Sequence, residues 1–138
     1  MIQVITYMID DNVLFMDAMR AWMEYEGIEG VEYFTSSEEL ILRLNRPVHV
    51  CVLDHGLSGS MTGLNLMRRI KKDHPHCYFI IMSGTEDIEV PIQFMNEGAH
   101  CFARKSWPDF IDKIRQFIKH YIAEATNDIE FAEHIRGY

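Results

Sequence analysis

Residues 48–54 read Val-His-Val-Cys-Val-Leu-Asp, the most strand-like run in the chain. Its β-branched valines stand among apolar neighbours, which is typical of a strand buried on both faces of a parallel sheet. The apolar run stops abruptly at Asp54, and a loop rich in Gly and Ser follows. The stretch therefore predicts a central strand that carries an acidic side chain at its carboxyl end.

Outward from this strand, apolar runs of strand length alternate with segments of helical period. We expect strands over residues 4–9, 31–34, 48–53, 78–82 and 101–103, and helices over residues 12–26, 36–45, 63–73 and 88–98, with a last helix after residue 106. Strands that alternate with helices in this way form parallel sheets with helices on both faces. The pattern predicts one α/β domain with a single doubly wound, five-stranded parallel sheet.

The end of the chain has no Gly/Ser linker and no second apolar core. Thr126 or Asn127 is suited to begin one more short helix, as Asp87 is for the helix over residues 88–98. We therefore expect the domain to cover residues 1–122, and residues 123–138 to form a tail or an extra short helix that is too small for an output domain.

The composition argues against a nucleic-acid-binding protein and against a membrane-spanning one. The chain has 138 residues, of which 48% are hydrophobic, enough for one core, and its net charge of -8 argues against a direct nucleic-acid partner. No signal peptide is recognisable at the start, and no run approaches the roughly 18 apolar residues of a membrane span. We expect a cytoplasmic protein whose three cysteines, Cys51, Cys77 and Cys101, are reduced core thiols.

Polar residues follow four of the predicted strands. They are Asp10, Asp11, Asp54, Ser83 and Lys105. Ligands of parallel sheets bind outside the carboxyl ends of the strands, so we expect these side chains to share one pocket. Three close carboxylates repel one another unless a cation compensates, and an all-oxygen ligand set suits Mg²⁺, for which Mn²⁺ can substitute.

Such a site is suited to phosphoryl transfer. An aspartate beside a metal ion can attack a phosphoryl donor as a covalent nucleophile. Lys105 would supply a positive charge to the phosphoryl oxygens, and Ser83 would supply a hydroxyl donor.

These residues, together with Gly84, Gly98-Ala99 and Phe102, resemble the receiver domain of two-component response regulators over residues 2–122. The resemblance implies a flavodoxin-like sheet of strand order 2-1-3-4-5 and a phosphorelay switch that turns over no metabolite. It further implies that a histidine kinase or phosphotransfer protein is the partner, alongside an output protein or domain. It also implies dimerisation through the fourth helix, the fifth strand and the fifth helix.

The resemblance assigns a role to each site residue. It implies that Asp54 accepts the phosphoryl group from a phosphohistidine, and that Asp11, Asp54 and the backbone carbonyl of Gly56 bind Mg²⁺ directly. Asp10 is implied to act through water.

The remaining roles concern the phosphorylated state. The resemblance implies that Lys105 pairs with the phosphoryl group. Ser83 is implied to move inward to hydrogen-bond it, while Phe102 rotates into the vacated space.

Two features depart from the family pattern. The loop after the acceptor usually carries Pro four residues on and Gly eight residues on, whereas here Ser58 takes the first place and Gly63 comes nine residues on. The family lysine is usually followed by a cis Pro, whereas Ser106 follows Lys105. A non-proline cis peptide costs ~3 kcal/mol, so this peptide is either strained or trans.

Three alternatives stay open at this stage. Asp10-Asp11 alone is equally typical of an ordinary helix N-cap. A degenerate receiver would use its acidic pocket only as part of a protein-interaction module. A Mg²⁺-dependent phosphatase or other α/β hydrolase would use the same carboxylates, but such enzymes generally need a substrate cap for which no insertion here is long enough.

Overall fold

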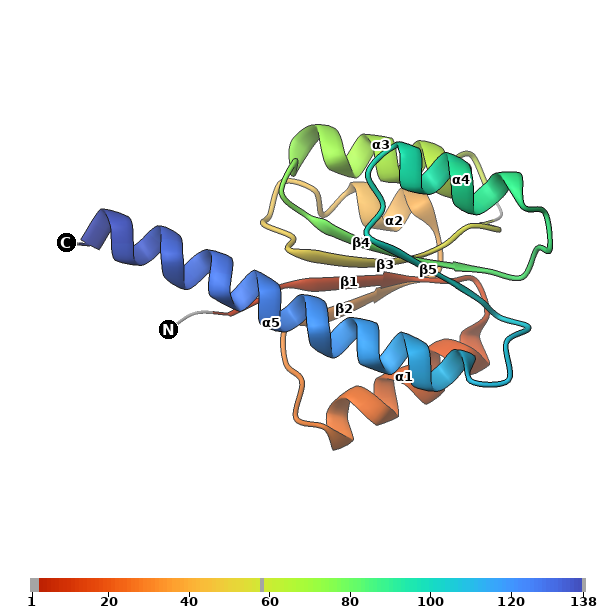
Figure 1. The fold of residues 1–138 in the computed structure, drawn as a ribbon, viewed down its shortest axis with the longest axis horizontal. Coiled ribbons are helices and arrows are strands. Elements are labelled where there is room, and N and C mark those ends of the chain that lie inside the picture. The colour runs from red at the N-terminus through yellow and green to blue at the C-terminus, as the bar shows by residue number, and fades with distance from the viewer. Residues whose placement is uncertain (1–2, 58, 138) are drawn as a thin grey trace.

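The computed structural model describes residues 3–57 and 59–137, and its centre is a parallel sheet (Figure 1). The strands are β1 (Thr6–Ile9), β2 (Val31–Phe34), β3 (Val50–Asp54), β4 (Tyr78–Ser83) and β5 (Cys101–Arg104). Their order is β2-β1-β3-β4-β5, and every neighbouring pair is parallel. The predicted fold class and strand order are confirmed.

Helices cover both faces of this sheet. Helices α1 (Val13–Tyr25) and α5 (Phe110–Gly137) lie on one face, and α2 (Ser37–Ile41), α3 (Gly63–Asp73) and α4 (Glu89–Asn96) lie on the other (Figure 1). The central strand β3 contributes side chains to the core on both faces of the sheet, because successive side chains of a strand point to opposite faces. Cys51 and Leu53 pack in the core under α2, α3 and α4, whereas Val50 and Val52 pack under α1 and α5.

Two helices differ from their predicted bounds. Helix α2 ends at Ile41 rather than near residue 45, because Arg43 and Leu44 donate their N–H groups to carbonyls three residues back and the chain tightens into turns. Helix α4 begins at Glu89, with Ile88 at the N-cap. The predicted cap, Asp87, instead accepts a hydrogen bond from the N–H of Glu89 at 3.0 Å.

The prediction of a separate tail or short helix after residue 122 is wrong. Helix α5 runs without a break over 28 residues. Thr126 does not cap a new helix, since its hydroxyl donates to the carbonyl of Ile122 at 2.8 Å within the same helix. Ala125 and Ile129 continue the apolar face of α5 onto the core. Despite this length, no helix of the described residues has the length and apolar character needed to cross a membrane.

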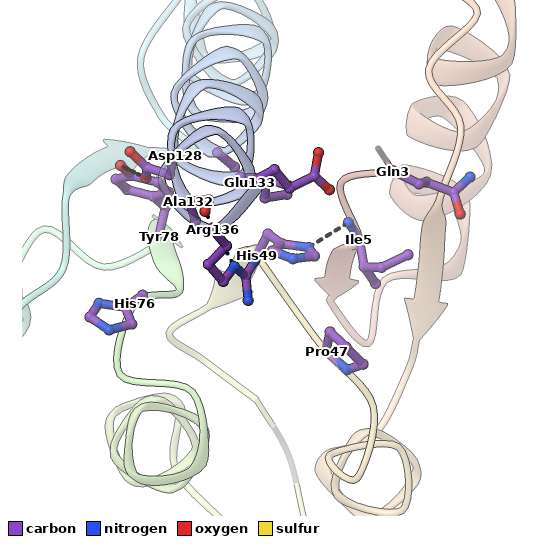
Figure 2. A pocket seen from close by; sticks show the side chains of 12 residues that line it. Gln3, Ile5, Pro47, His49, His76, Tyr78, Asp128, Ala132, Glu133 and Arg136 are labelled. Atoms are coloured by element: carbon purple, nitrogen blue, oxygen red, sulfur yellow. Dashed lines mark hydrogen bonds between the residues drawn. The ribbon is translucent and has the colours of Figure 1, made fainter. Parts of the chain in front are cut away.

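Beyond the sheet, α5 overhangs the amino-terminal ends of the strands (Figures 1 and 2). The hydroxyl of Tyr78 donates to Oδ2 of Asp128 at 2.6 Å and ties the helix to β4. Nδ1 of His49 accepts the N–H of Ile5 at 2.9 Å on the facing wall. Between these two contacts lies a pocket of about 750 Å³, which Ala132 and Arg136 of α5 also line.

The three cysteines are free thiols, as predicted. Cys51 and Cys77 are buried, and Cys101 is half-buried. Burial raises the pKa of the Cys51 thiol to about 12, so this group stays protonated and packs as a small apolar side chain.

Candidate functional site

Three carboxylates meet at the carboxyl ends of β1 and β3. Asp10, Asp11 and Asp54 each offer one oxygen, and these oxygens lie within 4.8 Å of one another. Asp10 and Asp54 are buried, whereas Asp11 is exposed. The crossovers of the parallel sheet therefore bring together residues that are more than 40 positions apart in the sequence, as the strand-end pattern predicted.

The helix-cap interpretation of the two adjacent aspartates is wrong. The N-cap of α1 is Asn12, whose side chain accepts the N–H of Phe15 at 3.1 Å. Oδ1 of Asp10 accepts the N–H of Asn12 at 2.9 Å and so fixes the turn that precedes the helix. Since Asn12 caps the helix, neither aspartate is needed at that position.

Lys105 lies among these carboxylates. Its Nζ is 2.8 Å from Oδ2 of Asp10 and 3.3 Å from Oδ1 of Asp54. Lys105 follows β5 directly, and its N–H donates to the carbonyl of Ser83 at 2.7 Å, which extends the β4–β5 ladder by one residue. The predicted convergence of Lys105 with the aspartates is what the structure shows.

Burial and charge shift the pKa values at this site. Burial and the neighbouring Asp10 raise the pKa of Asp54, against the opposing effects of Lys105 and of the Gly56 N–H, which donates to Oδ1 of Asp54 at 3.3 Å. Burial works against the charge on Lys105. The hydrogen bond to Asp10 and the charge of Asp54 outweigh that penalty and raise the pKa of Lys105.

The donor set fits a hard divalent cation. When every group is ionised, three carboxylates and one ammonium leave two negative charges in a largely buried cluster. Carboxylate oxygens are preferred ligands of Mg²⁺, and an exposed member such as Asp11 leaves room for water. The role of the Gly56 carbonyl as a further ligand stays a prediction.

Gly63, where the enlarged loop meets α3, has no room for a Cβ atom. A Cβ atom at this residue would lie 2.8 Å from the carbonyl oxygen of Asp54 and 2.9 Å from Cα of His55. The start of α3 therefore rests directly on the backbone of the acceptor turn. Ser58, the other departure noted in this loop, lies outside the described residues.

Glu38, which no sequence pattern singled out, binds Ser60 in this loop. Oε1 of Glu38, in the first turn of α2, accepts the Ser60 hydroxyl at 2.5 Å and the Ser60 N–H at 3.3 Å. The Ser60 hydroxyl is the main reason that the pKa of Glu38 falls to about 2. No local pattern indicates this contact, because 22 residues separate the partners.

Ser83 is fully buried at the end of β4. Its Oγ accepts the N–H of Thr85 at 3.1 Å and lies 3.3 Å from Nδ1 of His55. The ring of His55 meets the ring of Phe94 edge-on, with centroids 5.8 Å apart. The contact joins residues 28 positions apart, so no local sequence pattern indicates it.

The loop between β4 and α4 is tied to the end of β5. Nη1 of Arg104 donates to the carbonyl of Thr85 at 2.5 Å, and the hydroxyl of Ser106 donates to Glu86 at 2.6 Å. The Arg104 guanidinium also lies 5.7 Å from the ring centre of Phe102, which is half-buried. Among the described residues no peptide is cis, so the Lys105–Ser106 peptide is trans.

Comparison with known proteins agrees with this geometry. The family model of the response regulator receiver domain matches residues 6–119, and the chain belongs to this family. Its members are signalling domains of two-component systems. The receiver domain of NtrX from Brucella abortus is 26% identical and superposes with a TM-score of 0.75, covering 86% of this chain and 98% of that one.

The curated relatives are much longer proteins. The hydrogenase transcriptional regulatory protein HoxA of Cupriavidus necator is 29% identical over 120 residues, which make up 85% of this chain and 24% of that protein. A putative NtrX-like response regulator of Rickettsia bellii is 31% identical over 98 residues, or 70% of this chain and 20% of that protein. The chain thus spans about a quarter or less of the length of these relatives.

Proposed function

We propose that this receiver domain is a phosphorylation switch whose acceptor is Asp54. A histidine kinase or a phosphotransfer protein supplies the phosphoryl group, with Mg²⁺ held by Asp11, Asp54 and the carbonyl of Gly56, and with Asp10 acting through water. The observation that carries the proposal is the cluster of three carboxylates, two of which, Asp10 and Asp54, contact Lys105. Its charge and its buried acceptor match what phosphoryl transfer to a carboxylate requires.

The chain's own groups have distinct tasks in this reaction. A carboxylate oxygen of Asp54 forms a bond to phosphorus as the bond from phosphorus to the donor's imidazole nitrogen breaks. When bound, Mg²⁺ neutralises charge on the transferring group. Lys105 already lies 3.3 Å from Asp54 and pairs with a phosphoryl oxygen, and Ser83 turns inward to donate its hydroxyl to another. Phe102 then takes the space that Ser83 leaves.

The test is labelling by a small phosphodonor such as acetyl phosphate. We expect incorporation that requires Mg²⁺ or Mn²⁺ and that is lost in Asp54→Asn, with a hydroxylamine-labile phosphate on Asp54 by mass spectrometry. Asp17→Asn, on the outer surface of α1, is the matched control and should label normally. Labelling that persists in Asp54→Asn would contradict the assignment of the acceptor.

Two other readings of the site give different results in the same assay. A degenerate receiver that acts only by protein interaction would incorporate no phosphate, and its partner affinity would not change with beryllofluoride. A phosphatase would release phosphate from a phosphomonoester over many turnovers. We propose neither, because three carboxylates lie within 4.8 Å of one another and Lys105 contacts two of them.

We further propose that the α4–β5–α5 face forms a homodimer when Asp54 is phosphorylated, in a cytoplasmic protein that signals to an output protein or domain. Ile88, Ile92 and Met95 support this proposal, because they are exposed at helical spacing along α4 and form an apolar stripe. Sedimentation with and without beryllofluoride tests it. A chain that stays monomeric in both conditions would contradict the proposal.

A further inference from the structure

The imidazole of His55 touches the one hydroxyl that the proposed switch needs. Nδ1 of His55 lies 3.3 Å from Oγ of Ser83. Asp54 pairs with Met82 across β3 and β4, and His55 and Ser83 are the next residues along these two chain segments, at the edge of the sheet that carries the acceptor. Ser83 has no exposed surface, so its hydroxyl finds its partners within the protein. The pair is therefore part of the surroundings of the acceptor in the unphosphorylated protein.

The Ser83 hydroxyl has only one proton to donate. Its oxygen already accepts the N–H of Thr85 at 3.1 Å, which leaves the proton for a different partner. A neutral imidazole with an unprotonated Nδ1 is an acceptor at the right place. A phosphoryl oxygen on Asp54 would need the same proton, so the two acceptors compete for it.

His55 is itself held in position from several sides. Its N–H donates to the carbonyl of Met82 at 2.8 Å, and the backbone of Gly63 packs against its Cα. Its ring rests edge-on against Phe94, a fully buried residue of α4 with 1% exposed surface. These contacts favour the present position of the imidazole, so movement of Ser83 away from it breaks the hydrogen bond.

From this geometry we propose that His55 is a positioning residue that holds the hydroxyl of Ser83 in the unphosphorylated state. Nδ1 accepts a hydrogen bond from the Ser83 hydroxyl, and this hydrogen bond must break before Ser83 can donate to the phosphoryl group. His55 thereby raises the free energy needed to move Ser83 toward the phosphoryl group. Its ring connects this movement to α4 through the contact with Phe94. The inference rests on the proposed phosphoacceptor function.

Two substitutions separate the two contacts of His55. His55→Phe keeps a ring against Phe94 but has no acceptor for Ser83. His55→Asn places a carbonyl oxygen close to the position of Nδ1 but has no ring. The measured quantity is the apparent dissociation constant of beryllofluoride in the presence of Mg²⁺, followed by tryptophan fluorescence, and His134→Phe on the exposed end of α5 is the matched control.

We expect His55→Phe to bind beryllofluoride about three- to tenfold more tightly than the wild type, because one neutral hydrogen bond no longer opposes the movement of Ser83. His55→Asn should bind within about twofold of the wild type, since an acceptor is restored. An unchanged dissociation constant in His55→Phe, or an equal shift in both variants, would overturn the proposal.

A double-mutant cycle with Ser83→Ala tests whether His55 acts through Ser83. In the Ser83→Ala background, His55→Phe should no longer change the dissociation constant, because there is no hydroxyl left to hold. The same shift in both backgrounds would show that His55 acts by another route and would overturn the proposal. Thermal unfolding of each variant shows whether any has lost its fold, and His55→Leu, which also has no acceptor for Ser83, replaces His55→Phe if that variant does not fold.

Failure of this inference is distinguishable from failure of the proposed function. Wild-type protein that binds beryllofluoride and loses that binding in Asp54→Asn supports the phosphoacceptor site whatever the His55 variants do. Wild-type protein that binds none contradicts the site and, with it, the role of His55.

Discussion

Nζ of Lys105 lies 2.8 Å from Oδ2 of Asp10, a carboxylate whose side chain has no exposed surface. A buried carboxylate is costly unless an opposite charge compensates it. Lys105 reaches Asp10 from the end of β5 and is itself partly exposed, so it can move when another cation or a phosphoryl group arrives. In the metal-free protein, Lys105 is thus the cation that neutralises part of the acidic cluster.

Lys105→Met should therefore destabilise the metal-free protein. It should also increase the gain in the free energy of unfolding that Mg²⁺ produces. We expect a loss of about 2 kcal/mol in the free energy of unfolding in EDTA, because the charge of Asp10 loses its partner. Mg²⁺ should restore part of this loss. Urea unfolding with and without Mg²⁺ measures both effects, and Lys72→Met on the exposed side of α3 should change neither. An equal response of variant and wild type to Mg²⁺ would contradict the role of Lys105.

Gly63→Ala should strain the acceptor turn. The added Cβ would lie 2.8–2.9 Å from backbone atoms of Asp54 and His55, so the backbone must shift. We expect a loss of about 1–3 kcal/mol in the free energy of unfolding and slower labelling of Asp54. Gly84→Ala is the matched control, because a Cβ there meets no atom within 4 Å. Equal stability of the two variants would show that the loop can relax around residue 63.

Stability should fall as the pH drops below about 6.5. His49 and His100 precede β3 and β5, and their Nδ1 atoms accept the N–H groups of Ile5 and Phe79 at 2.9 and 3.0 Å. Burial lowers the pKa of both rings below the ordinary value of 6.5. A folded-state pKa that is lowered contributes stability above the unfolded value, and that stability is lost as pH falls through the folded-state value.

Urea unfolding between pH 8 and pH 5 measures this loss. Replacing both histidines with Asn keeps an acceptor oxygen but removes the titration. The double variant should therefore lose less stability than the wild type over the same range. Parallel pH profiles for the two proteins would mean that other groups cause the acid sensitivity.

Tyr78→Phe should loosen the overhanging end of α5. The hydrogen bond from Tyr78 to Asp128 is the main reason that the pKa of Tyr78 rises to about 12, together with burial. We expect faster hydrogen exchange in residues 124–137 and a loss of about 1 kcal/mol in the free energy of unfolding. Tyr25→Phe, at a site with 87% exposed surface, is the control and should change neither. Unchanged exchange in Tyr78→Phe would show that apolar packing alone holds the helix.

Local patterns account for the parts of the fold that were predicted. The period of apolar residues depends only on neighbours in the chain, so strands and helices could be placed from it, and the predicted helix over residues 63–73 has the bounds of α3. The ends of the helices were predicted less accurately than their positions in the chain. Asn12 rather than an aspartate caps α1, and α5 continues where a new helix was expected. In both cases several residues are suited to cap a helix, and the sequence pattern does not show which of them adopts the capping conformation.

The parallel five-stranded sheet and the convergence of Lys105 with the three aspartates could be predicted from local patterns, because parallel strands bring their carboxyl ends to one edge. Only the tertiary structure decided which side chains meet across the loops. The contacts of His55 with Ser83 and of Glu38 with Ser60 join residues 28 and 22 positions apart. Such contacts depend on distances set by the packing of whole elements, and no local period records them.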